Sequence, residues 1–451
     1  MRKLGALLAA ATACSLALTG CGGGEAGEEA RPAVSGSGAA GSGSQPATAL
    51  VLGKPASVKV TVGAGMNAAP FDVARSVTLP AGWTAAVYAR VDKARFMTFT
   101  PSGDLLVSQP SQGKVRIVRG GKATDFASGL NRPHDLVFAE IAGATWLFMA
   151  EADKVVRYPY KAGDLKAHDG QVVVDGLPDT STPELRGNYA HVLKNIAVKG
   201  ELLYVSIAST CNACVEDTVS DPRRAAIYTY AAAGKNAGRH LLATGIRNAE
   251  GLAFRPGTDE LWVVVNNRDN TLVPDDRDVD GDGKSDKGKR MSQFVDQYPA
   301  EELIKVRDGG FYGWPFCNPN SDNGTHNLGF HRDYELNRDG QKADCAKADP
   351  IDLGLPAHTA PLGLTFSPAL GGAVIPMHGS WNSTKPVGYK VVFVPWTANG
   401  PGDPVDLLSG LVDLKAAKPW LRPVDAALDA DGSILVSDDF GGSIIRLTPP
   451  K

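Results

Sequence analysis

A single histidine stands where its side chain could act as a base. His191 ends the segment 187–191, Gly-Asn-Tyr-Ala-His, and comes just before an apolar segment with the character of a strand. A neutral imidazole at such a place could take a proton from a substrate hydroxyl group. The alternative is a structural histidine, which is the commoner role for a histidine considered alone.

Three cations occupy comparable places, at the start of an apolar segment or in a connecting loop. They are Arg247, Lys385 and Arg422. If all three face one axis, they form a pocket for a small molecule with several negative charges, because guanidinium and ammonium groups bind carboxylates. The alternative is charge scattered over the surface.

An acidic segment that begins at Asp278 reads Asp-Val-Asp-Gly-Asp-Gly-Lys-Ser-Asp. Asp278, Asp280 and Asp282 alternate, and a glycine follows in the sixth place. This is the first half of a calcium loop, since Ca²⁺ takes several oxygen ligands around a sharp turn. Asp286 adds a further carboxylate, but Lys289 stands in the twelfth place, where such a loop carries glutamate. We predict a calcium site; a solvated acidic loop is the alternative.

The first residues have the pattern of a secretory signal with a lipid-attachment site. Two cations and an apolar stretch lead to Leu-Thr-Gly-Cys, which ends at Cys21. We expect residues 1–20 to be removed and Cys21 to be acylated; ordinary cleavage without lipid is the alternative. Residues 21–50 are mainly Gly, Ser, Ala and Glu, which predicts a flexible tether. The protein should therefore lie in the cell envelope and contact the membrane only through its lipid.

Four cysteines remain once the first two are assigned to the signal and the lipid. In an oxidising compartment local pairing is favoured, which gives Cys211–Cys214 and Cys317–Cys345, although four cysteines allow three pairings. A redox-active Cys-x-x-Cys is the alternative for the first pair. A covalent haem is excluded there because Val215 stands where the haem motif needs histidine.

Residues 51–451 contain six copies of one unit, a short apolar strand, a turn, a more apolar strand and a third alternating strand. The first strands are expected at 96–99, 135–138, 195–198, 251–254, 363–366 and 425–428. Short repeated strands with no helical period between them predict an all-β fold, a six-bladed β-propeller with long loops at one mouth.

Three further segments complete the expected propeller. The segment 77–91 precedes the first unit and should supply the outer strand of the last blade, which closes the ring and protects its edges. The insertion 270–300 interrupts the fourth blade, and the excursion 317–360 separates blades four and five. Loops of this length are usually functional or disordered, and these two are expected to lie around one mouth of the propeller.

Five motifs spread over the propeller resemble the soluble pyrroloquinoline quinone (PQQ)-dependent glucose/sorbosone dehydrogenase family, particularly its L-sorbosone and aldose dehydrogenase-like members. The most specific is Gly-Phe-Tyr-Gly-Trp-Pro at 310–315. The others are Asn-Arg-Pro-His at 131–134, Ser-Thr-Cys-Asn-Ala-Cys at 209–214, Arg-Asn-Ala-Glu-Gly-Leu-Ala-Phe at 247–254, and His-Gly-Ser-Trp-Asn at 378–382 with Lys-Pro-Val-Gly-Tyr-Lys at 385–390.

The resemblance implies roles for residues that the sequence pattern had already marked. His191 would take the proton from an anomeric or aldehyde-hydrate hydroxyl group as hydride passes to the quinone. Arg247 and Asn248 would contact the reacting edge of the quinone. Lys385 and Arg422 would bind its carboxylates.

The resemblance also implies a metal ion beside the quinone. A Ca²⁺ bound by main-chain oxygens near Asn267 and Arg268 would polarise the reacting carbonyl as a Lewis acid. The implied cofactors are therefore PQQ and Ca²⁺.

The resulting prediction is an enzyme that oxidises a sugar, or a sugar-derived aldehyde or alcohol, and passes electrons to an acceptor in the envelope. A non-catalytic propeller that binds a glycan or a protein is one alternative. A calcium-dependent lactonase is another, and it would need carboxylates such as Asp135 and Asp425 to converge on a metal, although both fit a structural turn better. With a net charge of −3 over 451 residues, the chain has no basic surplus for nucleic acid.

Overall fold

The computed structural model describes residues 52–413, 416 and 418–451. The predicted signal sequence, the lipidation site Cys21 and the tether 21–50 lie outside the described residues and stay predictions. Within the part of the chain that is described, no helix combines the length and the hydropathy needed to cross a bilayer.

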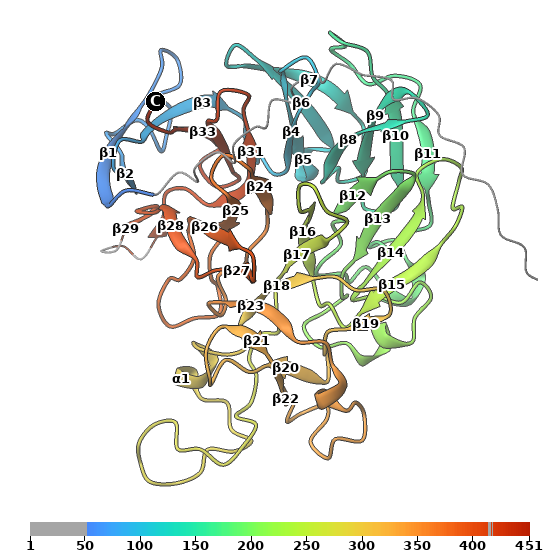
Figure 1. Cartoon of the computed structure of the whole chain (residues 1–451), viewed down its shortest axis with the longest axis vertical. Helices are drawn as coiled ribbons and strands as arrows, with labels where there is room; N and C mark the ends of the chain where they lie inside the picture. The colour runs from blue at the N-terminus through green and yellow to red at the C-terminus, as the bar shows by residue number, and fades with distance from the viewer. Residues whose placement is uncertain (1–51, 414–415, 417) are drawn as a thin grey trace, which may run out of the picture. The chain divides into compact units, whose positions relative to one another are not determined.

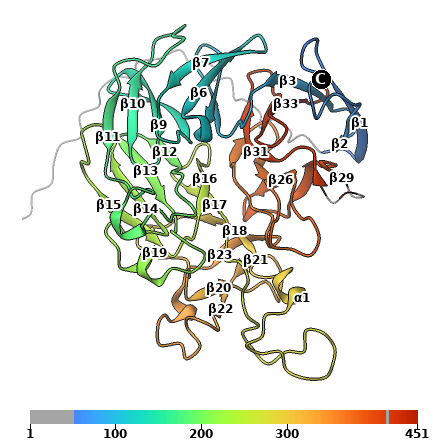
Figure 2. The ribbon, with the colours of Figure 1, turned by 180° about the vertical axis from the view of Figure 1, so that it is seen from behind.

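The predicted six-bladed propeller is confirmed, because the described strands form six antiparallel blades around one centre (Figure 1; Figure 2). From the inside outwards, the first three blades are β4 (Met97–Phe99), β5 (Leu105–Gln109), β6 (Lys114–Arg119) and β7 (Lys122–Ser128); β8 (Leu136–Ile141), β9 (Ala144–Ala150), β10 (Val155–Pro159) and β11 (Gln171–Val174); and β12 (Ile196–Lys199), β13 (Leu202–Ile207), β14 (Ala226–Ala231) and β15 (His240–Thr244).

The other three blades follow the same order. They are β16 (Ala249–Phe254), β17 (Leu261–Val265), β18 (Glu301–Lys305) and β23 (Ile351–Leu355); β24 (Thr365–Ser367), β25 (Gly372–Met377), β26 (Lys390–Thr397) and β28 (Val405–Leu408); and β31 (Pro423–Leu428), β32 (Ile434–Asp438), β33 (Ser443–Thr448) and β3 (Thr84–Arg90).

The inner strands close a complete ring, since each of β4, β8, β12, β16, β24 and β31 contacts the next and β31 returns to β4. Two buried carboxylates link neighbours in this ring. Asp135 Oδ2 accepts a hydrogen bond from Ile196 N of the next blade at 2.9 Å, and Asp425 Oδ2 accepts one from Met97 N at 2.9 Å. Both therefore have the structural role that the sequence favoured for them.

Apolar side chains pack between adjacent blades, which explains why the middle strands are apolar on both faces. Along β9, Leu147 and Met149 pack against blade one, while Phe148 and Ala150 pack against blade three. This alternation follows from the two-residue period of a strand. A blade can bury its faces only against its neighbours, so the fold depends on ring closure.

The closing strand predicted in 77–91 is confirmed, because β3 pairs antiparallel with β33 as the outer strand of blade six. The chain adds two further strands outside β3. They are β1 (Pro55–Thr61), which pairs parallel with β3, and β2 (Ser76–Pro80), which pairs antiparallel with β1. The edge of blade six is thereby covered.

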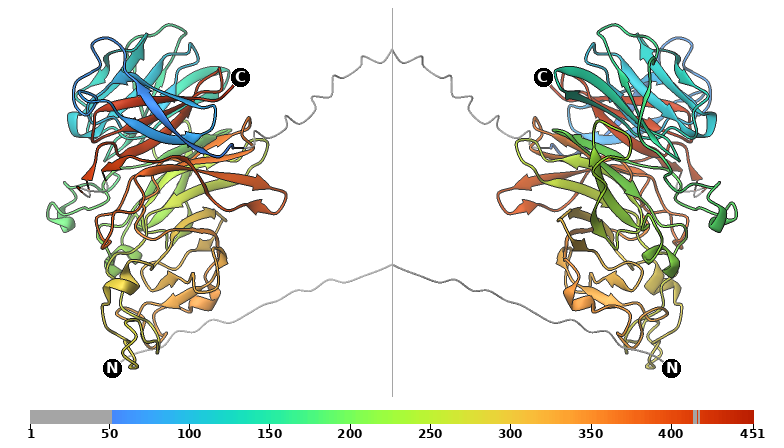
Figure 3. Two further views of the ribbon diagram at one scale, coloured as in Figure 1. Left: turned by 90° about the vertical axis from the view of Figure 1, so that its left-hand side faces the viewer. Right: turned by 90° about the vertical axis from the view of Figure 1, so that its right-hand side faces the viewer.

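The insertion 270–300 and the excursion 317–360 belong to blade four, and their tips lie beyond its outer edge (Figure 1; Figure 3). The excursion is not a loop throughout, because its residues Ile351–Leu355 form β23, the fourth strand of blade four. The remaining short elements are β19 (Gly310–Phe311), β20 (Cys317–Pro319), β21 (His326–Leu328), β22 (Phe330–Arg332), β27 (Gly400–Pro401), β29 (Val412–Asp413), β30 (Lys418–Pro419), α1 (Ser292–Val295) and the 3₁₀ turns η1 (Pro110–Gln112), η2 (Pro183–Leu185), η3 (Val215–Thr218) and η4 (Cys345–Lys347).

Candidate functional site

A cavity of about 800 Å³ lies where the inner strands begin. Segments that lead into five different inner strands line it, so the cavity is at the centre of the ring. The lining residues are Lys93, Arg95, Pro110, Ser111, Arg132, Ala190, His191, Val192, Leu193, Arg247, Asn248, Glu250, Asn266, Asn267, Asp269, Glu301, His358, Ala360, Leu362, His378, Gly379, Trp381 and Asp439.

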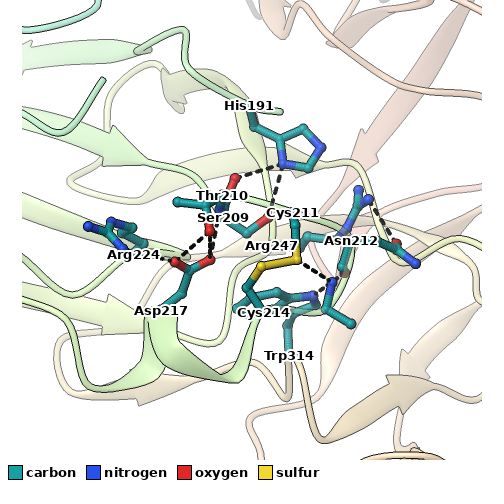
Figure 4. Close-up of a disulfide and its surroundings, with 11 residues drawn as sticks. His191, Ser209, Thr210, Cys211, Asn212, Cys214, Asp217, Arg224, Arg247 and Trp314 are labelled. Atoms are coloured by element: carbon teal, nitrogen blue, oxygen red, sulfur yellow. Dashed lines mark hydrogen bonds and ion pairs between the residues drawn. A yellow bond between two sulfur atoms is a disulfide. The ribbon is translucent and has the colours of Figure 1, made fainter. Parts of the chain in front are cut away.

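His191 is brought to this cavity in one defined tautomer. Its Nδ1 lies 2.8 Å from the carbonyl oxygen of Ser209 and 3.0 Å from the Ser209 hydroxyl oxygen (Figure 4). Because a carbonyl oxygen only accepts hydrogen bonds, Nδ1 carries the proton and Nε2 keeps its lone pair. Burial and the nearby Arg247 charge lower the pKa of His191 to about 4, so the imidazole is neutral at pH 7. His191 can therefore accept a proton.

Arg247 lies beside His191 and is almost fully buried. Its Nε donates to Asn212 O at 3.2 Å and its Nη1 to Asn266 O at 3.3 Å, while Nη2 donates to Asn212 Oδ1 at 3.0 Å and to Asp269 at 3.2 Å. These bonds use four of the five guanidinium N–H groups. The side chain is thus fixed in one direction at the cavity wall.

Asn248 also lines the cavity, and it connects the wall to a buried polar pair. Its Nδ2 donates to Glu250 Oε1 at 3.1 Å, and Glu250 Oε2 lies 3.2 Å from Nε2 of the fully buried His134. Burial alone would raise the pKa of Glu250, but the bond to His134 brings it below its usual range. The wall beside Arg247 therefore carries a fixed negative charge.

Cations line the cavity next to the inner strand β4. Arg95 Nη1 is 3.0 Å from Asp439, and Lys93 Nζ donates to the Asp439 carbonyl oxygen at 3.4 Å. Arg132, which precedes β8, is exposed in the cavity wall and has no side-chain partner among the described residues. In the order of the ring, β4 lies three positions from β16, so Lys93 and Arg95 are across the axis from Arg247, whereas Arg132, before β8, is two positions away.

Lys385 and Arg422 do not line the cavity, contrary to the expectation that they face the axis. Lys385 is exposed in the connection between β25 and β26. Arg422, whose side chain is 35% exposed, donates from Nε to Asp439 Oδ1 at 2.8 Å, and this ion pair holds it beside the lining residue Asp439.

The calcium site beside the quinone was predicted at main-chain oxygens near Asn267 and Arg268, and it stays a prediction; of these two residues, Asn267 lines the cavity and Arg268 does not. The main-chain N of Asn267 donates to Glu301 Oε2 at 2.5 Å. The Arg268 side chain is directed away, into ion pairs with Asp333 and, at 2.5 Å, with Glu335. Carboxylates of Asp269 and Glu301 are the oxygen groups that the cavity offers next to Asn267.

Carboxylate oxygens of Asp278, Asp280 and Asp286 lie within 4.8 Å of one another in the exposed acidic loop. Asp282 is not in this group and pairs with a lysine two residues on, at 3.1 Å. Lys289 Nζ lies 2.9 Å from Asp286, so an ammonium group neutralises one of the three. The calcium site in this loop stays a prediction.

Both predicted disulfides are present, Cys211–Cys214 and Cys317–Cys345. The first closes a short loop directly behind His191 and Arg247 (Figure 4). The second joins β20 to the η4 turn in the excursion.

Sequence reasoning missed several cavity residues, some of which it could have found. Arg95 and Arg132 precede the first strands of blades one and two, as Arg247 precedes that of blade four, so the same criterion would have selected them. Asp269 and Asp439 follow second strands, and no spacing rule in the sequence marks them.

Comparison with known proteins agrees with this fold. Over 129 residues the chain is 35% identical to a pyrroloquinoline quinone-dependent pyranose dehydrogenase of Coprinopsis cinerea, which is 23% of this chain and 18% of that protein. The holo PQQ domain of the pyranose dehydrogenase from Coprinopsis cinerea superposes with a TM-score of 0.66 and 22% identity, over 82% of this chain and 97% of that one.

A calcium structure of a Trichoderma reesei carbohydrate-active enzyme of family AA12 superposes with a TM-score of 0.67 and 21% identity, over 82% of this chain and 96% of that one. The family model described as TrAA12-like matches residues 77–449, which include all six blades. The resemblance to PQQ-dependent sugar dehydrogenases seen in the sequence is thereby confirmed, and the chain belongs to the TrAA12-like family.

Proposed function

We propose that this protein is an oxidoreductase that oxidises a sugar, or a sugar-derived aldehyde or alcohol, with PQQ as its cofactor and His191 as its general base. The observation that carries the proposal is the neutral His191 imidazole, whose Nε2 has no partner among the described residues, in the same cavity wall as the fixed Arg247 guanidinium.

The chain's own residues would bind the reactants and move one proton. His191 Nε2 takes the proton of the substrate hydroxyl group, and Ser209 keeps the ring in the required tautomer. The one Arg247 N–H group without a partner among the described residues would point toward the place where negative charge develops on the electron acceptor. Asn248, whose amide donates to Glu250 and Asn266, would line the same edge of the site. When bound, PQQ supplies the acceptor for the hydride that leaves the same carbon.

The cavity has the cations that a molecule with three carboxylates requires. Lys93 and Arg95 lie across the ring from Arg247, and Arg132 lies two blades from it. The Arg132 side chain has no hydrogen-bond partner among the described residues, so its donors are available to a ligand. A cavity of about 800 Å³ is within the usual range for a cofactor of this size. The quinone edge would then face Arg247, with its carboxylates toward Lys93 and Arg132.

The wall at Asn267 suits a calcium ion, which takes oxygen ligands. Burial raises the pKa of Glu301 to about 7, and Oε2 of the adjacent, fully buried Glu302 has no hydrogen-bond partner among the described residues. A cation here would favour the ionised form of Glu301. Asp269 and Glu301 would hold the ion, which would act as a Lewis acid on the reacting carbonyl.

The direct test is titration of the purified protein with PQQ in the presence of Ca²⁺, followed by dye reduction with aldoses and sorbosone. Saturable binding together with sugar-dependent reduction is the expected result. Absence of PQQ binding would reject the dehydrogenase and favour a propeller that binds a glycan or a protein.

A lactonase is not favoured, because Asp135 and Asp425 are already bonded to main-chain N–H groups of neighbouring blades.

Removing the cations of the cavity wall should weaken PQQ binding. In the double variant Lys93→Ala/Arg132→Ala, we expect the dissociation constant of PQQ to rise at least about tenfold, since each hydrogen bond to a charged group is worth about 1.5–3 kcal/mol. Equilibrium titration by fluorescence quenching measures this. Lys385→Ala is the matched control and should stay within about twofold of wild type; a larger effect at Lys385 than at Lys93 and Arg132 would reverse the assignment.

A further inference from the structure

The loop 209–214 joins β13 to the η3 turn and is closed by the Cys211–Cys214 disulfide. None of its residues lines the cavity, and both cysteines are partly exposed. Nevertheless, Figure 4 shows that the loop lies directly against both His191 and Arg247.

The start of the loop fixes the base. Ser209 accepts the Nδ1–H of His191 through its carbonyl oxygen at 2.8 Å. The neighbouring Thr210 carbonyl accepts from Ala190 N at 2.8 Å, which holds the residue before His191. Thr210 is anchored in turn, because its N and Oγ1 donate to the buried Asp217 at 2.7 Å and 2.8 Å.

The centre of the loop fixes the arginine. Asn212, which stands between the two cysteines, accepts from Arg247 twice, at its main-chain oxygen (3.2 Å) and at Oδ1 (3.0 Å). Its side chain also accepts from Asp269 N and donates to Asp269 O, both at 2.8 Å. Arg247 and its counter-ion Asp269 are thus joined through one amide side chain.

The same loop also links the two functional residues to each other. Ser209 N donates to the Arg247 carbonyl oxygen at 2.8 Å, so one residue contacts both the base and the arginine. A side chain on a loop can hold a partner in place only if its own backbone is restricted. The disulfide supplies this restriction on either side of Asn212.

We propose that Asn212 and the Cys211–Cys214 disulfide are positioning residues that align Arg247, and through Ser209 His191, for the reaction. The catalytic meaning of this alignment rests on the proposed function, but the alignment itself does not. Truncating Asn212 to alanine removes the Oδ1 acceptor of one of the four Arg247 hydrogen bonds, and opening the disulfide releases the backbone that holds a second acceptor, the Asn212 main-chain oxygen. Neither change alters a residue that lines the cavity.

Hydrogen exchange followed by mass spectrometry tests the alignment without any cofactor. In Asn212→Ala, the peptide that contains the Asp269 amide should exchange at least about tenfold faster, because this amide loses its acceptor. Asn212→Asp keeps an acceptor at the same place but cannot donate to the Asp269 carbonyl oxygen, so the amide should be more protected than in Asn212→Ala and less than in wild type. In Cys211→Ser/Cys214→Ser, peptides that contain Ala190 and Ser209 should also lose protection. The control Cys317→Ser/Cys345→Ser should leave these peptides unchanged.

A second arm measures PQQ binding and turnover of the same variants. Asn212→Ala should raise the PQQ dissociation constant at least about fivefold and lower kcat at least about tenfold, and Asn212→Asp, which keeps the acceptor for Arg247, should restore part of both. If Asn212→Ala and the disulfide variant match wild type in exchange, the proposal is wrong, whatever the protein binds. If wild type itself does not bind PQQ, the proposed function fails, and the hydrogen-exchange data alone test the alignment. If the disulfide variant does not fold, the exchange of Asn212→Ala tests the alignment by itself.

Discussion

Replacing His191 by alanine should lower kcat for sugar-dependent dye reduction by about 10²–10⁴-fold, the contribution that a positioned general base makes. The reason is that Ser209 leaves only Nε2 of this ring able to accept a proton. The PQQ dissociation constant should change little, because Lys93, Arg132 and Arg247 remain. Steady-state kinetics and a PQQ titration on one preparation separate the two effects.

The control for this variant is His326→Ala, since His326 is a surface histidine paired with Asp403 at 3.0 Å and does not line the cavity. It should turn over like wild type. A His191→Ala protein that binds PQQ and keeps kcat within about threefold of wild type would show that the base is elsewhere.

The same base predicts where activity is lost in acid. His191 must be unprotonated to act, and burial together with the Arg247 charge lowers its pKa to about 4. The acid limb of kcat/KM for the cofactor-loaded protein should therefore fall as the pH drops through about 4, well below the value of about 6.5 for a free histidine.

Much of the fold could be predicted because a propeller repeats one short-range pattern. Strands such as β9 alternate between two apolar interfaces, and that period is visible in the sequence. The outer strand of blade four could not be placed, because forty-five residues separate β23 from β18 and include several short strands of their own. The strands β1 and β2 were missed because only one edge strand is needed to close the ring.

Two predicted site residues that line the cavity lie shortly before a repeated inner strand. His191 lies five residues before the inner strand β12 and Arg247 two residues before β16, and both line the cavity. Lys385 and Arg422 do not line it, although Arg422 directly precedes the inner strand β31. Lys385 lies in a long connection whose path no repeat defines, and Arg422 is drawn into an ion pair by Asp439, a residue that the sequence does not mark.

Asp439 is the centre of a buried charge cluster at the cavity wall. Its carboxylate lies 3.0 Å from Arg95, 2.8 Å from Arg422 and 3.1 Å from His378, and its side chain is 8% exposed. Burial would raise the pKa of Asp439, but His378 and the two arginines hold it far below its usual range. One carboxylate therefore balances Arg95 of blade one and Arg422 of blade six and accepts a hydrogen bond from His378 of blade five.

Asp439→Asn should lower the free energy of unfolding by about 1.5–3 kcal/mol at pH 7, because it leaves the partly buried Arg95 and Arg422 without their counter-ion. The folded pKa of Asp439 is depressed, so its stabilisation is complete above the unfolded value of about 3.9 and is lost as the pH falls through the folded pKa. The difference in the free energy of unfolding between wild type and variant, measured by urea denaturation, should accordingly narrow in acid.

The control Asp125→Asn removes an exposed ion pair with Lys114 and should lower the free energy of unfolding by less than about 1 kcal/mol. Equal losses at Asp439 and Asp125, or a gap independent of pH, would mean that the cluster does not stabilise the ring.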